Sequence, residues 1–254
     1  MYLFVLIVAA CTIPLEPTRT SFVTTVRVGA SRPLRFLVDT GASVTVIDRS
    51  VARELRIQPE KNVTAVSTTG TLGTEATILD DVRTGNLTVA RTPALVTELP
   101  TFVNHGRLDG ILGMSIFAGR AVLFDVRRRC VELDSAPPRG VTLRAHEVAG
   151  RVAIDVGGLN FVLDSGASFP VMMSSGARAL TATTGIVEIT SAAGSQRVST
   201  ATIPILRIGG VAFRDVAVAF APASRDERED ALLPITLFGA VYIAAARDVV
   251  IVER

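Results

Sequence analysis

Two eight-residue segments of the chain are nearly identical and lie 125 positions apart. Phe36–Ser43 reads FLVDTGAS, and Phe161–Ser168 reads FVLDSGAS. A single Asp-hydroxyl-Gly triplet is typical of an ordinary tight turn. Here, however, both triplets follow three apolar residues and precede Ala-Ser. The repetition predicts a chain of two similar halves, each of which contributes one such loop.

The similarity extends to both sides of these segments. Shorter matches occur in the same order, and those that follow the octapeptides have an offset of 124 positions. Such agreement indicates a duplicated half. The matches are Val26–Gly29 with Ile154–Gly157, Ala65–Gly70 with Ile189–Gly194, and Arg83–Leu87 with Arg207–Val211.

Short apolar runs separated by Gly, Pro, Asn and Ser continue through both halves and predict an all-β protein. Only Arg49–Arg56 has the pattern of a short helix. The 254 residues suffice for two lobes, each with its own core. Pro137 and Pro138 lie in a segment that disfavours regular structure. We therefore expect an N-terminal lobe over 18–134, a linker over 135–142 and a C-terminal lobe over 143–254.

Composition narrows the chemistry. The formal net charge is only +2 and the arginines are spread along the chain, so we expect no nucleic-acid partner. The two histidines, His105 and His146, lie in no recognisable catalytic motif. No Cys or His pair has metal-ligand spacing, so we expect no metal and no cofactor. Carboxylate chemistry remains as the main catalytic option.

The duplicated aspartates, Asp39 and Asp164, suit that chemistry. Two adjacent carboxyl groups cannot both ionise cheaply, so they share one proton. The pair then offers a general base that activates water and a general acid that protonates the leaving nitrogen. Glycines at positions 41 and 166 would let each loop approach its partner closely.

These motifs resemble those of the aspartic peptidases, and in particular the retropepsin-like branch. The alanines after the glycines, and Leu108–Met114 followed by Val122–Asp125, carry the resemblance further. It implies a two-lobed all-β acid-protease-type β-barrel with the active-site cleft between the lobes. It also implies an endopeptidase that hydrolyses an extended polypeptide through Asp39 and Asp164. The alternative is a catalytically idle relative that binds peptides in the same cleft.

The resemblance also assigns roles to residues around the aspartates. Thr40 and Ser165 would brace the two loops against each other by hydrogen bonds. Hydroxyls at positions 43 and 168 would donate to carboxylate oxygens or to nearby backbone, or would be plain turn serines. Gly70 and Gly194 fall where the family places its flap, with ordinary hairpin turns as the alternative. The supporting residues predicted in this way are Thr40, Gly41, Ser43, Ser165, Gly166, Ser168, Gly70 and Gly194.

The second half departs from the pattern at Pro234, which stands where the first half has Gly113. Proline fixes φ and lacks an N–H, so we expect the segment behind Asp164 to be built differently. Ser224–Asp230 mixes charges of both signs and predicts an exposed loop.

The first residues form an apolar run that is too short to span a bilayer as a helix. The run fits a signal segment over 1–17, and Val8–Cys11 resembles a bacterial lipobox. Lipidation of Cys11 would attach an exported protein to a membrane and leave Cys130 as an unpaired core residue. A buried strand is the alternative for this segment.

The presence of both motifs in one chain predicts a monomeric enzyme. Retroviral-type peptidases assemble the carboxyl pair from two subunits with one motif each. Here a polypeptide substrate would meet both aspartates in a single chain.

Overall fold

The computed structural model describes residues 11–16, 22–102, 106–117, 119–173, 185–222, 229–244 and 248–252. Strands dominate, and the fold is the all-β acid-protease type that the sequence predicts. The predicted helix is confirmed as α1 (Arg49–Glu54), whose first turn is capped by the Asp48 carboxylate. No helix among these residues is long and apolar enough to cross a membrane.

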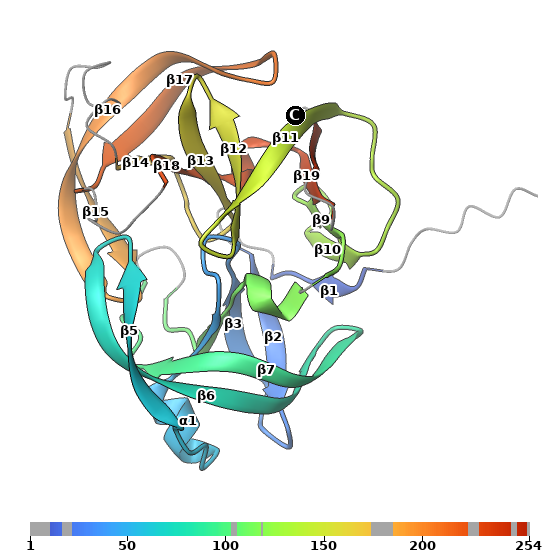
Figure 1. The fold of residues 1–254 in the computed structure, drawn as a ribbon, viewed down its shortest axis with the longest axis vertical. Coiled ribbons are helices and arrows are strands. Elements are labelled where there is room, and N and C mark those ends of the chain that lie inside the picture. The colour runs from blue at the N-terminus through green and yellow to red at the C-terminus, as the bar shows by residue number, and fades with distance from the viewer. Residues whose placement is uncertain are drawn as a thin grey trace, which may run out of the picture.

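The first half forms a seven-stranded sheet in the described part of the chain (Figure 1). Its buried faces are rich in branched apolar residues, as strands that cover a core require. In sheet order the strands are β2 (Val23–Val28), β3 (Leu34–Val38), β8 (Gly110–Leu112), β4 (Thr45–Asp48), β7 (Leu87–Thr97), β6 (Gly70–Thr84) and β5 (Lys61–Ser67).

The second half repeats this order strand for strand, which confirms the duplication at the level of topology. Its strands are β12 (Arg151–Val156), β13 (Leu159–Asp164), β18 (Ala231–Pro234), β14 (Val171–Met172), β17 (Val211–Phe220), β16 (Gly194–Ile208) and β15 (Gly185–Ser191).

One upstream match from the sequence is displaced in the structure. Val26 pairs with Leu34, and the counterpart of Leu34 in the second half, Leu159, pairs with Val156. Val156, rather than Ile154, is therefore the structural counterpart of Val26. The difference arises because the β2–β3 turn is longer than the β12–β13 turn.

A further group of strands interleaves the two halves. β9 (Val122–Asp125) of the first half pairs with β19 (Ala240–Ile243) of the second, so the halves are joined by a ladder of backbone hydrogen bonds. The remaining strands of this interlobe group are β1 (Ile13–Pro14), β10 (Cys130–Leu133), β20 (Asp248–Val252) and β11 (Val141–Val148). β11 begins within the predicted linker and continues into the second lobe by pairing with β12.

The core is continuous between the halves. One cluster of buried apolar side chains contains residues of both lobes and of the interlobe strands. Phe124 on β9 lies edge-on to Phe22 and Phe117, and Phe213 lies edge-on to Phe238. Such edge-to-face contacts add to the stabilisation that each ring gains from burial, within the first half for Phe124 and within the second for Phe213.

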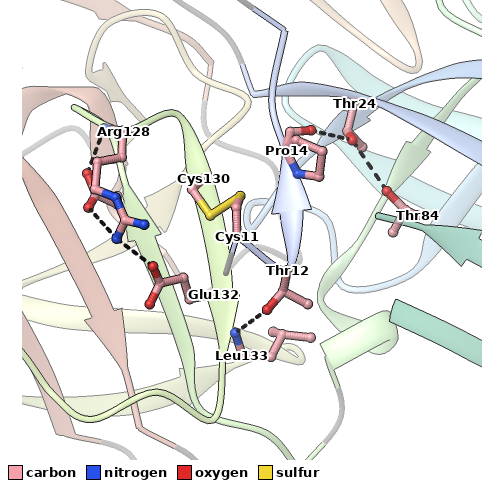
Figure 2. Close-up of a disulfide and its surroundings, with 10 residues drawn as sticks. Cys11, Thr12, Pro14, Thr24, Thr84, Arg128, Cys130, Glu132 and Leu133 are labelled. Carbon is pink, nitrogen blue, oxygen red and sulfur yellow. Dashed lines mark hydrogen bonds and ion pairs between the residues drawn. A yellow bond between two sulfur atoms is a disulfide. The ribbon is translucent and has the colours of Figure 1, made fainter. Parts of the chain in front are cut away.

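A disulfide joins Cys11 to Cys130 and fastens the two-residue strand β1 to β10 (Figure 2). Near it, the Thr12 hydroxyl accepts the Leu133 amide and the Thr24 hydroxyl donates to the Pro14 carbonyl. This pairing overturns two expectations, because a sulfur in a disulfide cannot carry a lipid thioether. Cys11 is not a lipidation site in this structure, and Cys130 is not unpaired. Residues 1–10 and 17, which belong to the expected signal segment, lie outside the described residues.

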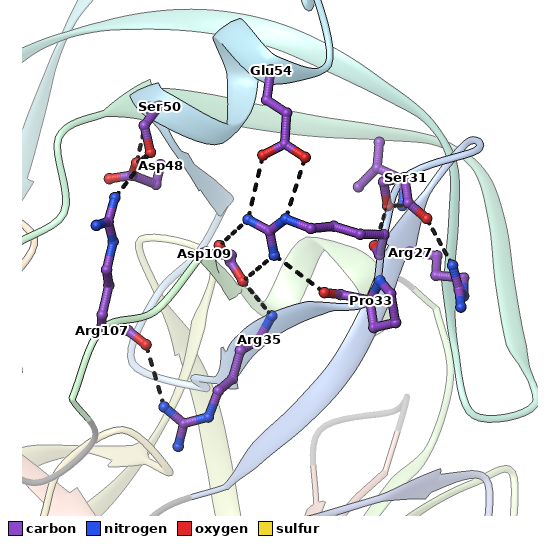
Figure 3. A network of polar contacts seen from close by, with 11 residues as sticks. Arg27, Ser31, Pro33, Arg35, Asp48, Ser50, Glu54, Arg107 and Asp109 are labelled. Carbon is purple, nitrogen blue, oxygen red and sulfur yellow. Dashed lines mark hydrogen bonds and ion pairs between the residues drawn. The ribbon is translucent and has the colours of Figure 1, made fainter.

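A network of charged groups supports the start of β3 (Figure 3). The Asp109 carboxylate accepts the Arg35 amide at 2.8 Å and both terminal nitrogens of Arg32. Glu54 on α1 forms an ion pair with the same Arg32. Burial opposes ionisation of Asp109, but these hydrogen bonds and the charge of Arg32 lower its pKa. The network thus fixes β3 against β8, directly before the first Asp-Thr-Gly loop.

Candidate active site

Each Asp-hydroxyl-Gly loop begins where a buried central strand ends. Asp39 follows β3, and its amide donates to the carbonyl of Leu112 on the parallel strand β8 at 2.9 Å. Asp164 is the last residue of β13 and lies opposite Pro234 on the parallel strand β18. Rigid strands therefore position both aspartates, as precise chemistry requires.

The two carboxyl groups face each other across the lobe boundary. A Cβ added to Gly41 would lie 2.6 Å from the Asp164 carboxyl carbon, and one added to Gly166 would lie 2.8 Å from that of Asp39. Any side chain at either position would displace the opposing carboxyl group. The predicted close approach is thus found, and its reason is space, since neither glycine has a positive φ.

The hydroxyls of Thr40 and Ser165 connect the loops. The Thr40 hydroxyl donates to the Leu163 carbonyl at 2.7 Å and accepts the Ser165 amide at 2.9 Å. The Ser165 hydroxyl likewise donates to the Val38 carbonyl at 2.7 Å and accepts the Thr40 amide at 3.0 Å. Both residues are fully buried. Four reciprocal hydrogen bonds without competing water therefore tie the two aspartates to one geometry.

The two carboxyl groups have unequal surroundings. Burial, and then the negative charge of Asp164, raise the pKa of Asp39 well above its ordinary value, against the opposing effect of the Gly41 and Ala42 amides. Burial also raises the pKa of Asp164, but opposing effects come from the Asp39 hydrogen bond, the Ala167 and Gly166 amides and the positive charge of Arg151. Those amides lie 2.9 and 2.7 Å from one Asp164 oxygen. Both carboxyl groups thus accept amide hydrogen bonds from their own loops, and the positive charge of Arg151 distinguishes Asp164 from Asp39.

Between the lobes lies a cavity of about 520 Å³, into which both aspartates open. It is the cleft that the family resemblance implies. Ser43 and Ser168 line it, but their contribution to the carboxylates remains a prediction. Apolar side chains of both lobes form most of the remaining wall. On the first lobe these are Leu37, Val46, Leu95, Phe102 and Ile111, and on the second they are Phe169, Val171, Ile189 and Leu232.

Two hairpin tips also line the cavity. β5 turns into β6 at residues 68–69, and β15 turns into β16 at residues 192–193. Gly70 and Gly194 follow these turns with φ of +143° and +114°, a conformation that glycine adopts without strain. The tips meet each other, because the Ser191 hydroxyl bonds those of Ser67 at 2.7 Å and Thr69 at 2.6 Å.

An ion pair on the cavity wall escaped the sequence analysis. Arg151, at the start of β12, binds Glu229 through two parallel hydrogen bonds of 2.7 and 2.8 Å. The Glu229 side chain is only 1% exposed, so the expectation of an exposed loop is wrong at this residue. Residues 224–228 of that loop lie outside the described residues. The mixed charges of this segment had predicted exposure to solvent. No local sequence feature indicated that Glu229 pairs with Arg151, which lies 78 positions away.

Pro234 does not alter the strand pairing behind Asp164. β18 pairs with β13 as β8 pairs with β3, and a short 3-10 helix follows each (η1, Met114–Phe117; η2, Ile235–Leu237). In the first lobe the Gly113 amide reaches the Thr45 hydroxyl at 3.4 Å. The equivalent residues of the second lobe are Pro234 and Pro170, so donor and acceptor are lost together. The expected difference is thus absent from the strand pairing.

Other titratable groups form no comparable centre. In the part of the chain that the structure describes, no group of three or more His, Cys, Asp or Glu is arranged to hold a metal ion. His146 lies on β11, opposite Ala153. His105 is outside the described residues.

Two lobes of one topology, each bringing a carboxyl group to a shared cavity, define the acid-protease class of protein. Residues 24–116 match the family model of the aspartyl proteases, and residues 151–239 match that of the "gag-polyprotein putative aspartyl protease". The chain belongs to the retropepsin-like aspartic proteases, and its general function is that of an aspartic protease. No curated protein sequence matches it.

Proposed function

We propose that the protein is an endopeptidase in which Asp39 and Asp164 form one catalytic pair that activates water. The observation that carries this proposal is the mutual approach of the two carboxyl groups, each over the other loop's glycine. Their unequal surroundings assign the roles. Both aspartates accept amides of their own loops, but the positive charge of Arg151 favours ionised Asp164, so we assign Asp164 as the general base and Asp39 as the general acid.

In the proposed reaction, the Asp164 carboxylate takes a proton from a water molecule as its oxygen attacks the peptide carbonyl carbon. Asp39 gives its proton to the carbonyl oxygen, which yields a neutral tetrahedral diol. Collapse of the diol returns a proton to Asp39 and transfers the Asp164 proton to the leaving nitrogen, so the C–N bond breaks and the initial protonation state is restored. The scheme requires one proton on the pair in its resting state.

The shape of the site favours an extended polypeptide substrate. The cavity lies between the two lobes and is lined by the hairpin tips that precede Gly70 and Gly194, at residues 67–69 and 190–192. We propose that these tips act as flaps, which open by breaking the hydroxyl contacts around Ser191 and close over the bound chain. Closure would exclude water and strengthen the electrostatic effects at the carboxyl pair.

Incubation with a denatured protein tests this proposal, with and without a peptide inhibitor that mimics the tetrahedral intermediate. Cleavage within the polypeptide that the inhibitor abolishes supports the endopeptidase. Tight inhibitor or peptide binding without any cleavage would instead indicate the idle peptide-binding relative. Mapping the cleavage sites by mass spectrometry would define the preferred sequence.

We also propose that the protein acts in an oxidising, extracytoplasmic compartment. The support is the Cys11–Cys130 disulfide, because such bonds persist mainly outside reducing cytosol. Alkylation of the native protein before and after reduction, followed by intact-mass measurement, would count its free thiols. Two free thiols in protein taken from its source would contradict this location.

A further inference from the structure

The ion pair between Arg151 and Glu229 gives the two walls of the cavity different chemistry. Among its described lining residues, Arg151 is the sole cation, and only Asp39, Asp164 and Glu229 are anionic. The pair therefore adds a charged group to the wall of the second lobe, whose other lining residues besides Asp164 are uncharged.

The first lobe has an apolar residue at the position of Glu229. Asp109 and Asp230 are equivalent, because their amides donate to the carbonyls of Arg35 and Asn160 at the same place on β3 and β13. The residue before Asp109 is Leu108, and the residue before Asp230 is Glu229. Leu108 is 1% exposed and packs in an apolar cluster with Phe102 and Ile111. The equivalent position is therefore apolar in the first lobe and charged in the second.

Arg151 is the member of the pair that a substrate can reach. Its side chain is 14% exposed, against 1% for Glu229. Each terminal guanidinium nitrogen gives one hydrogen bond to Glu229. A guanidinium has five N–H donors in a fixed plane, so donors remain for a further acceptor. Because Glu229 lies behind the guanidinium and fixes it, the group offers directed donors at little entropic cost.

We propose that the Arg151–Glu229 pair makes this protein select a substrate side chain that ends in an accepting oxygen, Glu or Gln, on the side of the scissile bond that the second lobe covers. The first lobe's wall takes a large apolar side chain on the opposite side. Lys and Arg are rejected at the polar subsite by the Arg151 charge, and aliphatic residues leave its donors unpaired. This selectivity rests on the proposed peptidase function.

Matched peptides test the selectivity in the full chain. A peptide library first locates the two positions that flank the cleaved bond, and peptides with Glu, Gln, Leu or Lys at the polar position are then compared by kcat/KM. The wild-type protein is expected to favour Glu and Gln over Leu by about 10-fold to 100-fold, the range for a charge-assisted hydrogen bond. The opposite position should favour large apolar residues.

The double variant Arg151→Met/Glu229→Leu is expected to lose most of the Glu/Leu ratio. The ratio is the proper readout, because a change at the carboxyl pair affects both peptides alike. Removing both charges also avoids a buried, unpaired carboxylate. Arg128→Met/Glu132→Leu is the matched control, since this ion pair lies in the β9–β10 hairpin and not in the cavity.

Two outcomes would overturn the proposal. Wild-type cleavage without preference for Glu or Gln at either flanking position would refute the selectivity and leave the peptidase intact. An unchanged ratio in the folded double variant would do the same. If that variant fails to fold, Arg151→Lys, which keeps the charge but loses the planar donors, is expected to lower the ratio. Absence of cleavage with every peptide would refute the peptidase function itself and the selectivity with it.

Discussion

The two lobes share one strand order but differ in how their ends are fastened and in how their aspartates are surrounded. β1 of the first half pairs with β10 through two residues and is held by the Cys11–Cys130 disulfide. The structural counterpart of β1 in the second half is β11. This strand pairs with β20 through four residues and also pairs with β12. The short strand is thus joined covalently to its neighbour, whereas the longer one is held by two runs of strand pairing.

The difference at the aspartates has a chemical consequence. A symmetric pair would give each carboxyl group an equal share of the proton. Here the positive charge of Arg151 favours the ionised form of Asp164. Divergence of the halves is expected once both are in one chain, because an identical two-fold interface is no longer required. This asymmetry is the basis on which we propose separate acid and base roles for the two equivalent loops.

The largest effect is expected from Asp39→Asn and Asp164→Asn. Each should lower kcat by about 1,000-fold or more, because the reaction needs both an acid and a base.

The pKa of Asp39 is raised on folding, so its protonation stabilises the fold at acidic pH and this stabilisation is lost as pH rises through the raised pKa. Neutral Asn avoids that loss, and thermal unfolding at pH 7 should show Asp39→Asn to be no less stable than wild type. Substantial turnover by folded Asp39→Asn or Asp164→Asn would refute the assignment of these residues as the catalytic pair.

The next largest effect concerns the hydroxyls that connect the loops. Thr40→Val and Ser165→Ala each leave a buried carbonyl and a buried amide without their hydroxyl partner, at a cost of about 2–4 kcal/mol in the free energy of unfolding. Denaturant titration would measure both. Similar losses in the free energy of unfolding would show that the two hydroxyls contribute equally to stability. A difference above about 1 kcal/mol would show which hydroxyl contributes more. Ser195→Ala, which removes a solvent-exposed hydroxyl bond, is the control.

Loss of the clamp on β1 should have a comparable or smaller effect. Cys11→Ser/Cys130→Ser opens a loop of 119 residues and should lower the free energy of unfolding by about 2–4 kcal/mol. Urea titration of the variant, beside wild type with and without reductant, provides the measurement. If reduction leaves the wild-type midpoint unchanged, the short strand does not depend on its disulfide.

A smaller change is expected in the pH dependence of Arg151→Met/Glu229→Leu. Removing the Arg151 charge raises the pKa of Asp164, which must be ionised to act as base, so the acidic limb of kcat/KM should move to higher pH. Glu229→Gln keeps the arginine, and its acidic limb should not move upward. A profile of the double variant that coincides with wild type would mean that Arg151 does not divide the roles.

No change at all is expected on dilution. Because both aspartates lie in one chain and β9 pairs with β19 across the halves, specific activity should stay constant down to the nanomolar range. Sedimentation should show a monomer. Activity that fell in step with a monomer–dimer equilibrium would mean that the two halves of one chain do not form the site.

The local motifs could be predicted from the sequence because each consists of adjacent residues. The two octapeptides identified Asp39 and Asp164, and the hydroxyl residues beside them were found to connect the loops as predicted. The short apolar runs and turn residues gave the all-β fold for the same reason, since strand and turn preferences act within a few positions.

Features that depend on distant partners could be decided only by the tertiary structure. The Cys11–Cys130 bond joins residues 119 positions apart, and the sequence context of Cys11 had suggested lipidation instead. Glu229 appeared in a charged loop, yet the fold buries it against Arg151. Burial also raises the pKa of both aspartates, and only Asp164 receives the effect of the distant Arg151 charge among the main causes, although the motifs differ only by Thr40 and Ser165 within the Asp-hydroxyl-Gly triplet. The sequence thus identified the two carboxyl groups to which we assign the chemistry, and packing determined their surroundings, because solvation and electrostatic surroundings arise only when remote segments meet.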